Sequence, residues 1–132
     1  MFDTSKIEIN AAFYELYESV FGDDFFVILT SMNPTGRMKA LRAKKADELS
    51  EEEKAEVLKF NASLLSKYNR LTPRVAYIGT LLHQKKYNGS HEDYMAFLAE
   101  CDAADFLNPE VQGEIWKKIN LDQALPKSAK NA

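Results

Sequence analysis

Two histidines and one cysteine are the side chains of this sequence whose types could bind a metal ion. They are His83, His91 and Cys101. Their spacing matches neither the short paired-ligand patterns of zinc sites nor the i, i+4 pair that places two ligands on one face of a helix. We therefore interpret the histidines as surface residues near helix ends and the cysteine as a small core residue. No metal ion or other cofactor is expected.

The acidic stretch from Asp102 to Glu110 is a second candidate, because it lies between two expected helices, as a calcium-binding loop does. An EF-hand loop needs oxygen ligands at positions 1, 3 and 5, glycine at position 6 and glutamate at position 12. Counted from Asp102, the last four of these positions hold Ala104, Phe106, Leu107 and Gly113. The acidic residues are therefore interpreted as helix caps and a solvated turn.

The remaining polar residues form no catalytic motif. The five glycines occur singly, so the sequence has no glycine-rich loop for binding phosphate. No serine has the context of a nucleophile elbow, and each pair of carboxylates stands at an expected helix start, where capping explains it. The chain is therefore expected not to be an enzyme. A site assembled from residues far apart in the sequence is the alternative that a single sequence leaves open.

The distribution of charge is more informative. The formal net charge is −3, which argues against nucleic acid as the main partner, because basic residues supply most of the affinity for phosphate backbones. The stretch from His91 to Trp116 contains seven acidic residues and no lysine or arginine. A basic segment before Asp47 has no acidic residue among its cations. These cations are Arg37, Lys39, Arg42, Lys44 and Lys45.

Two interpretations of these charged segments are open. They are either solvated helix faces or complementary surfaces for self-association or for partner proteins. Because the basic segment offers few residues to a core, we identify residues 37–45 as the candidate for a mobile partner-binding arm. A small DNA-binding regulator that uses this segment as its contact helix is a further alternative, against which the overall acidity counts.

Helical periodicity dominates the elements that must position these residues. Apolar residues recur at helical spacing over 13–21, and Gly22 is expected to end that helix. The apolar run 25–29 fits a helix capped by one of the two preceding aspartates, which we favour, or a buried strand. Ser50 and Glu53 form a capping box for another helix. One side of that helix is expected to carry Val57, Leu58, Leu64, Leu65 and Tyr68.

Three further helix starts follow. Thr72–Pro73 has the pattern of a cap followed by proline at the first helical position. The apolar run Val75–Leu82 after it is typical of a helix at the centre of a bundle, and a generic adaptor could instead dimerise through it. Ser90 and Asn108 are expected to cap the last two helices. The sequence therefore predicts an all-α fold, a single compact bundle of five to seven helices.

The expected domain organisation is simple. Residues 1–125 are predicted to form one helical domain, and the polar segment 126–132 a flexible, disordered tail. The longest apolar run is far shorter than the ~20 residues needed to span a bilayer, so no membrane association is expected. The N-terminal residues lack the pattern of a secretory signal, and the single cysteine cannot form an intrachain disulfide. A cytoplasmic location is therefore expected.

Four segments of the C-terminal half form a recognisable pattern: Leu71–Gly79, Tyr94–Leu98, Asn108–Val111 and Leu125–Asn131. Together they resemble tail assembly chaperones of long-tailed phages and prophages, in particular those of Gram-positive hosts. The resemblance covers roughly residues 55–131 and rests on helix-packing patterns rather than on a catalytic motif. The N-terminal third departs from the family, whose members often begin with a short β-strand segment.

The resemblance implies a non-catalytic, mostly helical protein that acts in the cytoplasm of the infected host cell and is absent from the mature virion. Such proteins bind the long tape-measure protein and help to recruit subunits of the major tail protein. The family commonly makes a second, longer product by translational frameshifting near the end of this reading frame. No family residue with a known role can be placed on this sequence, and the host and the oligomeric state stay open.

Overall fold

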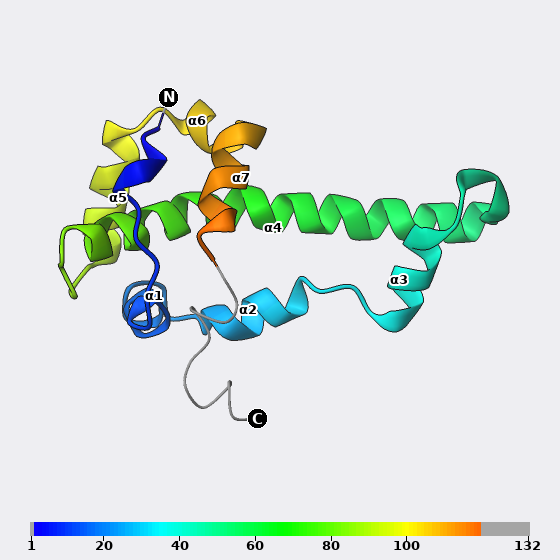
Figure 1. Ribbon diagram of the computed structural model, residues 1–132, viewed down its shortest axis with the longest axis horizontal. Coiled ribbons are helices and arrows are strands. Elements are labelled where there is room, and N and C mark those ends of the chain that lie inside the picture. The colour runs from blue at the N-terminus through cyan, green and yellow to red at the C-terminus, as the bar shows by residue number, and fades with distance from the viewer. Residues whose placement is uncertain (1, 120–132) are drawn as a thin grey trace.

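The computed structural model describes residues 2–119, which form seven α-helices and two short 3₁₀ helices, with no strand in this range (Figure 1). The all-α prediction is confirmed. The predicted domain limit at residue 125 and the predicted tail at 126–132 lie outside the described residues. The elements are η1 Thr4–Lys6, α1 Phe13–Phe21, α2 Phe25–Ser31, α3 Gly36–Ala43, η2 Ala46–Glu48, α4 Glu51–His83, α5 His91–Glu100, α6 Ala103–Leu107 and α7 Pro109–Lys117.

Helix α4 is the axis of the molecule. It has 33 residues, which corresponds to a length of roughly 50 Å. Its first turn has the expected capping box, in which the Ser50 hydroxyl accepts from the Glu53 N–H while the Glu53 carboxylate accepts from the Ser50 N–H. Three acidic residues in this turn also suit the positive end of the helix dipole.

The predicted helix start at Thr72–Pro73 is wrong, because α4 runs through Pro73 without a break. Proline removes one backbone N–H from a helix interior and normally bends or ends the helix. Here the Thr72 hydroxyl donates to the Tyr68 carbonyl at 2.6 Å, and the neighbouring apolar residues Leu71 and Val75 are both fully buried. Tertiary packing on both sides of the proline therefore outweighs the local stop signal.

The core lies around the C-terminal half of α4. Val75, Ile78 and Leu82 are completely buried there, as predicted for a central helix. Helix α1 packs on this half with Phe13 and Tyr17, α2 adds Phe25 at its start, and α7 contributes apolar residues from the other side. An interface between two chains at the Val75–Leu82 run is therefore unavailable in the folded protein, because this chain's own helices cover it.

Local signals set the ends of the first two helices as expected. Gly22 takes up the left-handed conformation, with φ of 76°, and ends α1. The Asp24 carboxylate then accepts from the N–H groups of Phe26 and Val27, which starts α2. The run 25–29 is therefore helical and not a strand.

The N-terminal half of α4 projects away from this core. Figure 1 shows it extending past α2 toward α3, which packs against it near its far end. Met38 and Leu41 of α3 are buried in that contact but do not join the main core. Among residues 2–119, no helix combines the length and apolar character needed to cross a bilayer.

Candidate functional site

The basic segment forms α3 and the turn after it, and three of its five cations contact α4. Arg37 makes a two-point contact with Glu56, from Nε to Oε1 at 3.0 Å and from Nη2 to Oε2 at 2.9 Å. Lys44 Nζ lies 3.7 Å from Glu53 Oε2. The Arg42 guanidinium lies 5.6 Å from the centroid of the Phe60 ring, within the range of a cation–π contact.

These contacts lower the pKa values of two glutamates of α4. The hydrogen bond from Arg37 lowers the pKa of Glu56 below its usual value. The pKa of Glu53 is also lowered, first by the N–H of Ser50 that it accepts and also by the charge of Lys44. Both carboxylates therefore stay ionised and hold the cations of the basic segment in place at neutral pH.

The prediction of a mobile arm that is poor in core residues is accordingly revised. Helix α3 is capped by Thr35 Oγ1, which accepts from the Met38 N–H at 3.2 Å. It is also docked on α4 by two buried apolar side chains and by the ion pairs. Lys39 and Lys45 are exposed, and neither forms an ion pair with a described residue. Of the five predicted partner-binding residues, these two have their charge most available.

The acidic segment lies toward the opposite end of the long axis from α3 (Figure 1). As predicted, several of its acidic residues cap helices or lie in their first turns. Asp102 caps α6 by accepting from the Ala104 N–H at 3.0 Å. Glu92, Asp93 and Glu110 stand in the first turns of α5 and α7. The two charged segments therefore do not pair within one chain, which leaves the interpretation as complementary surfaces between molecules untested.

The metal-ligand candidates remain dispersed. His83 is the last residue of α4 and His91 the first of α5, and both are exposed. Cys101 caps the end of α5 and is only partly buried, and this burial raises the pKa of its thiol. The described residues contain no group of three histidine, cysteine or acidic side chains that could hold a metal ion.

A cluster around Arg74 was not predicted. Its guanidinium donates to the Tyr17 hydroxyl at 3.3 Å, lies 3.5 Å from Asp23 Oδ2, and stands 4.6 Å from the centroid of the Phe21 ring. The cluster ties α1 to α4, so its role is structural. Arg74 stands in the sequence beside an apolar run, and nothing in its local pattern distinguishes it from a solvent-exposed arginine.

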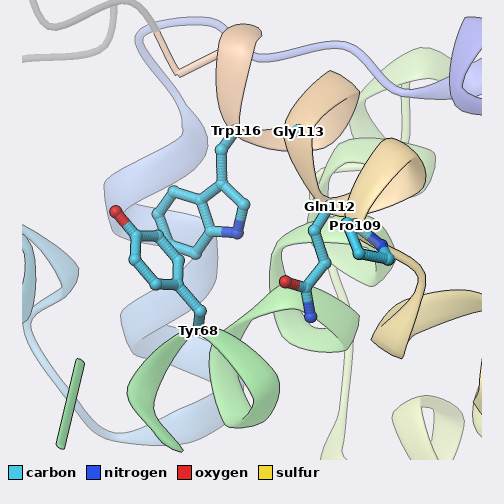
Figure 2. Close-up of a pocket in the computed structure, with 5 residues that line it drawn as sticks. All are labelled: Tyr68, Pro109, Gln112, Gly113 and Trp116. Atoms are coloured by element: carbon cyan, nitrogen blue, oxygen red, sulfur yellow. The ribbon is translucent and has the colours of Figure 1, made fainter. Parts of the chain in front are cut away.

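An open groove crosses the face where α7 lies on α4 (Figure 2). Tyr68 and Trp116 form one wall with their rings edge to face, 4.9 Å between centroids, and the cavity volume is about 290 Å³. Two of its polar nitrogens are paired within the protein: Trp116 Nε1 donates to Thr72, and Gln112 Nε2 donates to Asn69 and to the Phe106 carbonyl. The residues lining the groove are Tyr68, Pro109, Gln112, Gly113 and Trp116.

Apolar side chains are also exposed on the projecting half of α4. The sequence placed Leu58 and Leu65 on the same side as Val57 and Leu64, and this is wrong. Val57 and Leu64 are half-buried, whereas Leu58 and Leu65 are 69% and 58% exposed. The two pairs differ by one residue, which rotates the side chain by about 100° around the helix. The segment therefore has one face toward α3 and another toward solvent.

No family model, no curated protein and no solved structure matches this chain.

Proposed function

We propose that this protein is a non-catalytic phage tail assembly chaperone, which binds the tape-measure protein and helps to recruit the major tail protein. The open groove of Figure 2 is the observation that carries the proposal. Because most of its exposed surface is apolar, and the side-chain nitrogens of Trp116 and Gln112 are hydrogen-bonded within the protein, it offers mainly apolar and aromatic surface to a partner. Apolar side chains on one face of a partner helix are the ligands that such grooves accept.

The surroundings of the groove support a protein ligand. Gly113 lies exposed in the groove wall, and a Cβ atom built there meets nothing within 4 Å. A partner backbone can therefore approach α7 closely at this point. Lys39 and Lys45 at the far end of the molecule add a separate positive surface, which suits several weak contacts along an elongated partner. The proposed location is the host cytoplasm during tail assembly.

Co-expression with a tape-measure protein, which the proposal expects to be encoded beside this chain, tests the proposal. A soluble complex that contains many copies of the chain per tape-measure molecule, measured by pull-down and light scattering, is the expected result. A tape-measure protein that is equally insoluble with and without the chain contradicts the proposal. A generic helical adaptor would then be the better description.

Two variants locate the contact. Gly113→Arg adds a long charged side chain at a groove residue where a Cβ atom meets nothing within 4 Å, and it is expected to reduce capture of the tape-measure protein by about tenfold or more. Ser63→Arg, on an exposed face of the projecting half of α4, is the matched control and should leave capture unchanged. Equal capture by both variants would show that the groove is not the contact surface.

A further inference from the structure

The projecting half of α4 carries an apolar stripe that no other element within residues 2–119 covers. It consists of Ala55, Leu58, Ala62 and Leu65, which we call the exposed seam. Their alternating spacing of three and four residues keeps the side chains on one face of the helix. Both leucines are more than half exposed, although apolar residues at this spacing normally face another helix.

The same face is covered in the other half of α4. Continuing the spacing beyond Leu65 leads to Asn69 and Thr72. Asn69 Oδ1 accepts from Gln112 Nε2 at 3.0 Å, and Thr72 Oγ1 accepts from Trp116 Nε1 at 2.9 Å. Helix α7 thus packs on this face directly beyond the exposed seam (Figure 1). The seam is therefore the uncovered continuation of a face that already packs against a helix.

The order of side chains along the exposed seam fits a second copy in the antiparallel direction. If Leu58 faces Ala62 of a second chain, Leu65 faces Ala55, and two-fold symmetry repeats both contacts in reverse. Each large side chain then meets a small one, which is the arrangement that fills the space between two close helices. A parallel pairing in register would instead place leucine against leucine and alanine against alanine.

The charges agree with the same arrangement. The segment 60–66 has no charged residue, so this half of the contact surface brings no charge of its own to desolvate. Glu52 and Arg70 lie about equally far from the middle of the contact, are exposed, and form no ion pair with a described residue. Antiparallel pairing brings each of them beside the other in the second copy. Lys59 lies near the two-fold axis, and its long stem allows the two ammonium groups to separate into solvent.

We propose that two copies of this chain pair through their exposed seams, with the α4 helices antiparallel about a two-fold axis close to residue 60. Pairing about residue 60 places Glu52 of the second copy opposite Tyr68, so the groove of Figure 2 lies at the end of this contact. The inference is independent of the proposed function, because it concerns the chain alone. A dimer would nevertheless double the number of contacts that the protein offers to an elongated partner.

Sedimentation and light scattering on the full chain, at concentrations up to about 1 mM, test the pairing. Dimers are expected to form as concentration rises, and Leu58→Ser with Leu65→Ser to weaken them by about tenfold or more. The matched control is Val27→Ser with Met95→Ser, which removes two other exposed apolar residues and should leave association unchanged. A monomeric wild type, or a dimer that survives loss of both leucines, overturns the proposal.

Cysteine cross-linking tests the direction of the helices. In a Cys101→Ser background, Leu58→Cys and Ala62→Cys are made as separate proteins and oxidised alone or mixed. Antiparallel pairing predicts efficient disulfide cross-linking only in the mixture, because position 58 of one chain faces position 62 of the other. If each variant instead cross-links with itself, and mixing the two adds no further cross-linking, the helices are parallel. That result overturns the proposed geometry.

Discussion

The two halves of α4 share one continuous helix but differ in what surrounds them. Around the C-terminal half, helices α1, α5, α6 and α7 and the segment before α1 meet, and residues such as Val75 and Ile78 are completely buried. Along the N-terminal half, α3 is the main neighbour among the described elements and is docked by Met38, Leu41 and exposed ion pairs, while two leucines face solvent. Stability is thus concentrated in one half, and surface for binding is available on the other.

The difference follows from the composition of each half. Between residues 71 and 82 the helix is apolar nearly all round, so it is stable only when other helices enclose it. The N-terminal half has a capping box, an acidic first turn and ion pairs on one face. These local interactions support a helix that is exposed on most sides, without a large core around it.

The largest effect is expected from the same substitution made once in each half. Leu82→Ala removes a completely buried side chain and should lower the free energy of unfolding by about 2–5 kcal/mol. Leu58→Ala, at an exposed position of the same helix, should change it by less than about 0.5 kcal/mol. Urea denaturation at low protein concentration, where dimers are not populated, measures both. Similar losses for the two variants would contradict the contrast between the halves.

Two glycines sharpen the comparison, because they have opposite surroundings. A Cβ atom at Gly79 would collide with the Ile7 side chain, so Gly79→Ala is expected to destabilise the protein by about 1–3 kcal/mol. The Gly79 carbonyl also accepts from the Glu8 N–H at 3.0 Å, which holds the segment before α1 close to the backbone of α4. Gly113 has open space around it, so Gly113→Ala should stabilise α7 by about 0.4–1 kcal/mol. Thermal unfolding shows whether each substitution lowers or raises the stability of the protein. A Gly79→Ala variant as stable as the wild type would contradict the close packing at this position.

The hydroxyl that supports the proline-containing turn can be removed with little change in shape. Thr72→Val leaves the Trp116 N–H without its acceptor and removes the donor to the Tyr68 carbonyl. We expect a loss of about 1–2 kcal/mol, with a change in the fluorescence of Trp116, which is the single tryptophan of the chain. Thr80→Val is the control, since its hydroxyl donates only to the Ala76 carbonyl. Equal losses would show that the indole contact contributes nothing.

Local signals along the sequence predicted most of the helix ends. Gly22, Asp24, Ser50, Ser90 and Asn108 act as caps or stops at the places where their chemistry suggested them. Each of these residues satisfies backbone groups within a few positions of itself. A single sequence contains all the information that such a contact needs.

The features that sequence reasoning missed all depend on contacts distant along the chain. Pro73 stays inside α4 because elements before and after it pack on that turn, and Arg74 is held by α1. Leu58 and Leu65 were assigned to the wrong face because periodicity allowed two neighbouring stripes, and the packing of α3 and of the main core decides between them. For the same reason the basic segment was expected to be mobile, although Glu53 and Glu56 bind it.

The smallest effect concerns the pH dependence of the docking of α3. Arg37 lowers the pKa of Glu56 from its ordinary value of 4.5. A carboxylate whose pKa is lower in the folded state stabilises the fold above its ordinary pKa, and this contribution is lost as the pH falls through the lowered value. Below about pH 4.5 the docking of α3 should therefore weaken. Because both partners are exposed, solvent and salt limit the effect.

Methyl NMR during acid titration can separate the two halves. The Met38 side chain is buried between α3 and α4. Its methyl signal should shift toward its exposed value at a higher pH than the signals of Leu82 in the core. Glu56→Gln removes the titrating group and the charge that binds Arg37, so Met38 should be less well packed at neutral pH and should respond less to acid. If Met38 and Leu82 change together at every pH, α3 is part of the same cooperative unit as the core. The projecting half of α4 would then owe its order to the bundle, and its ion pairs with α3 would contribute little.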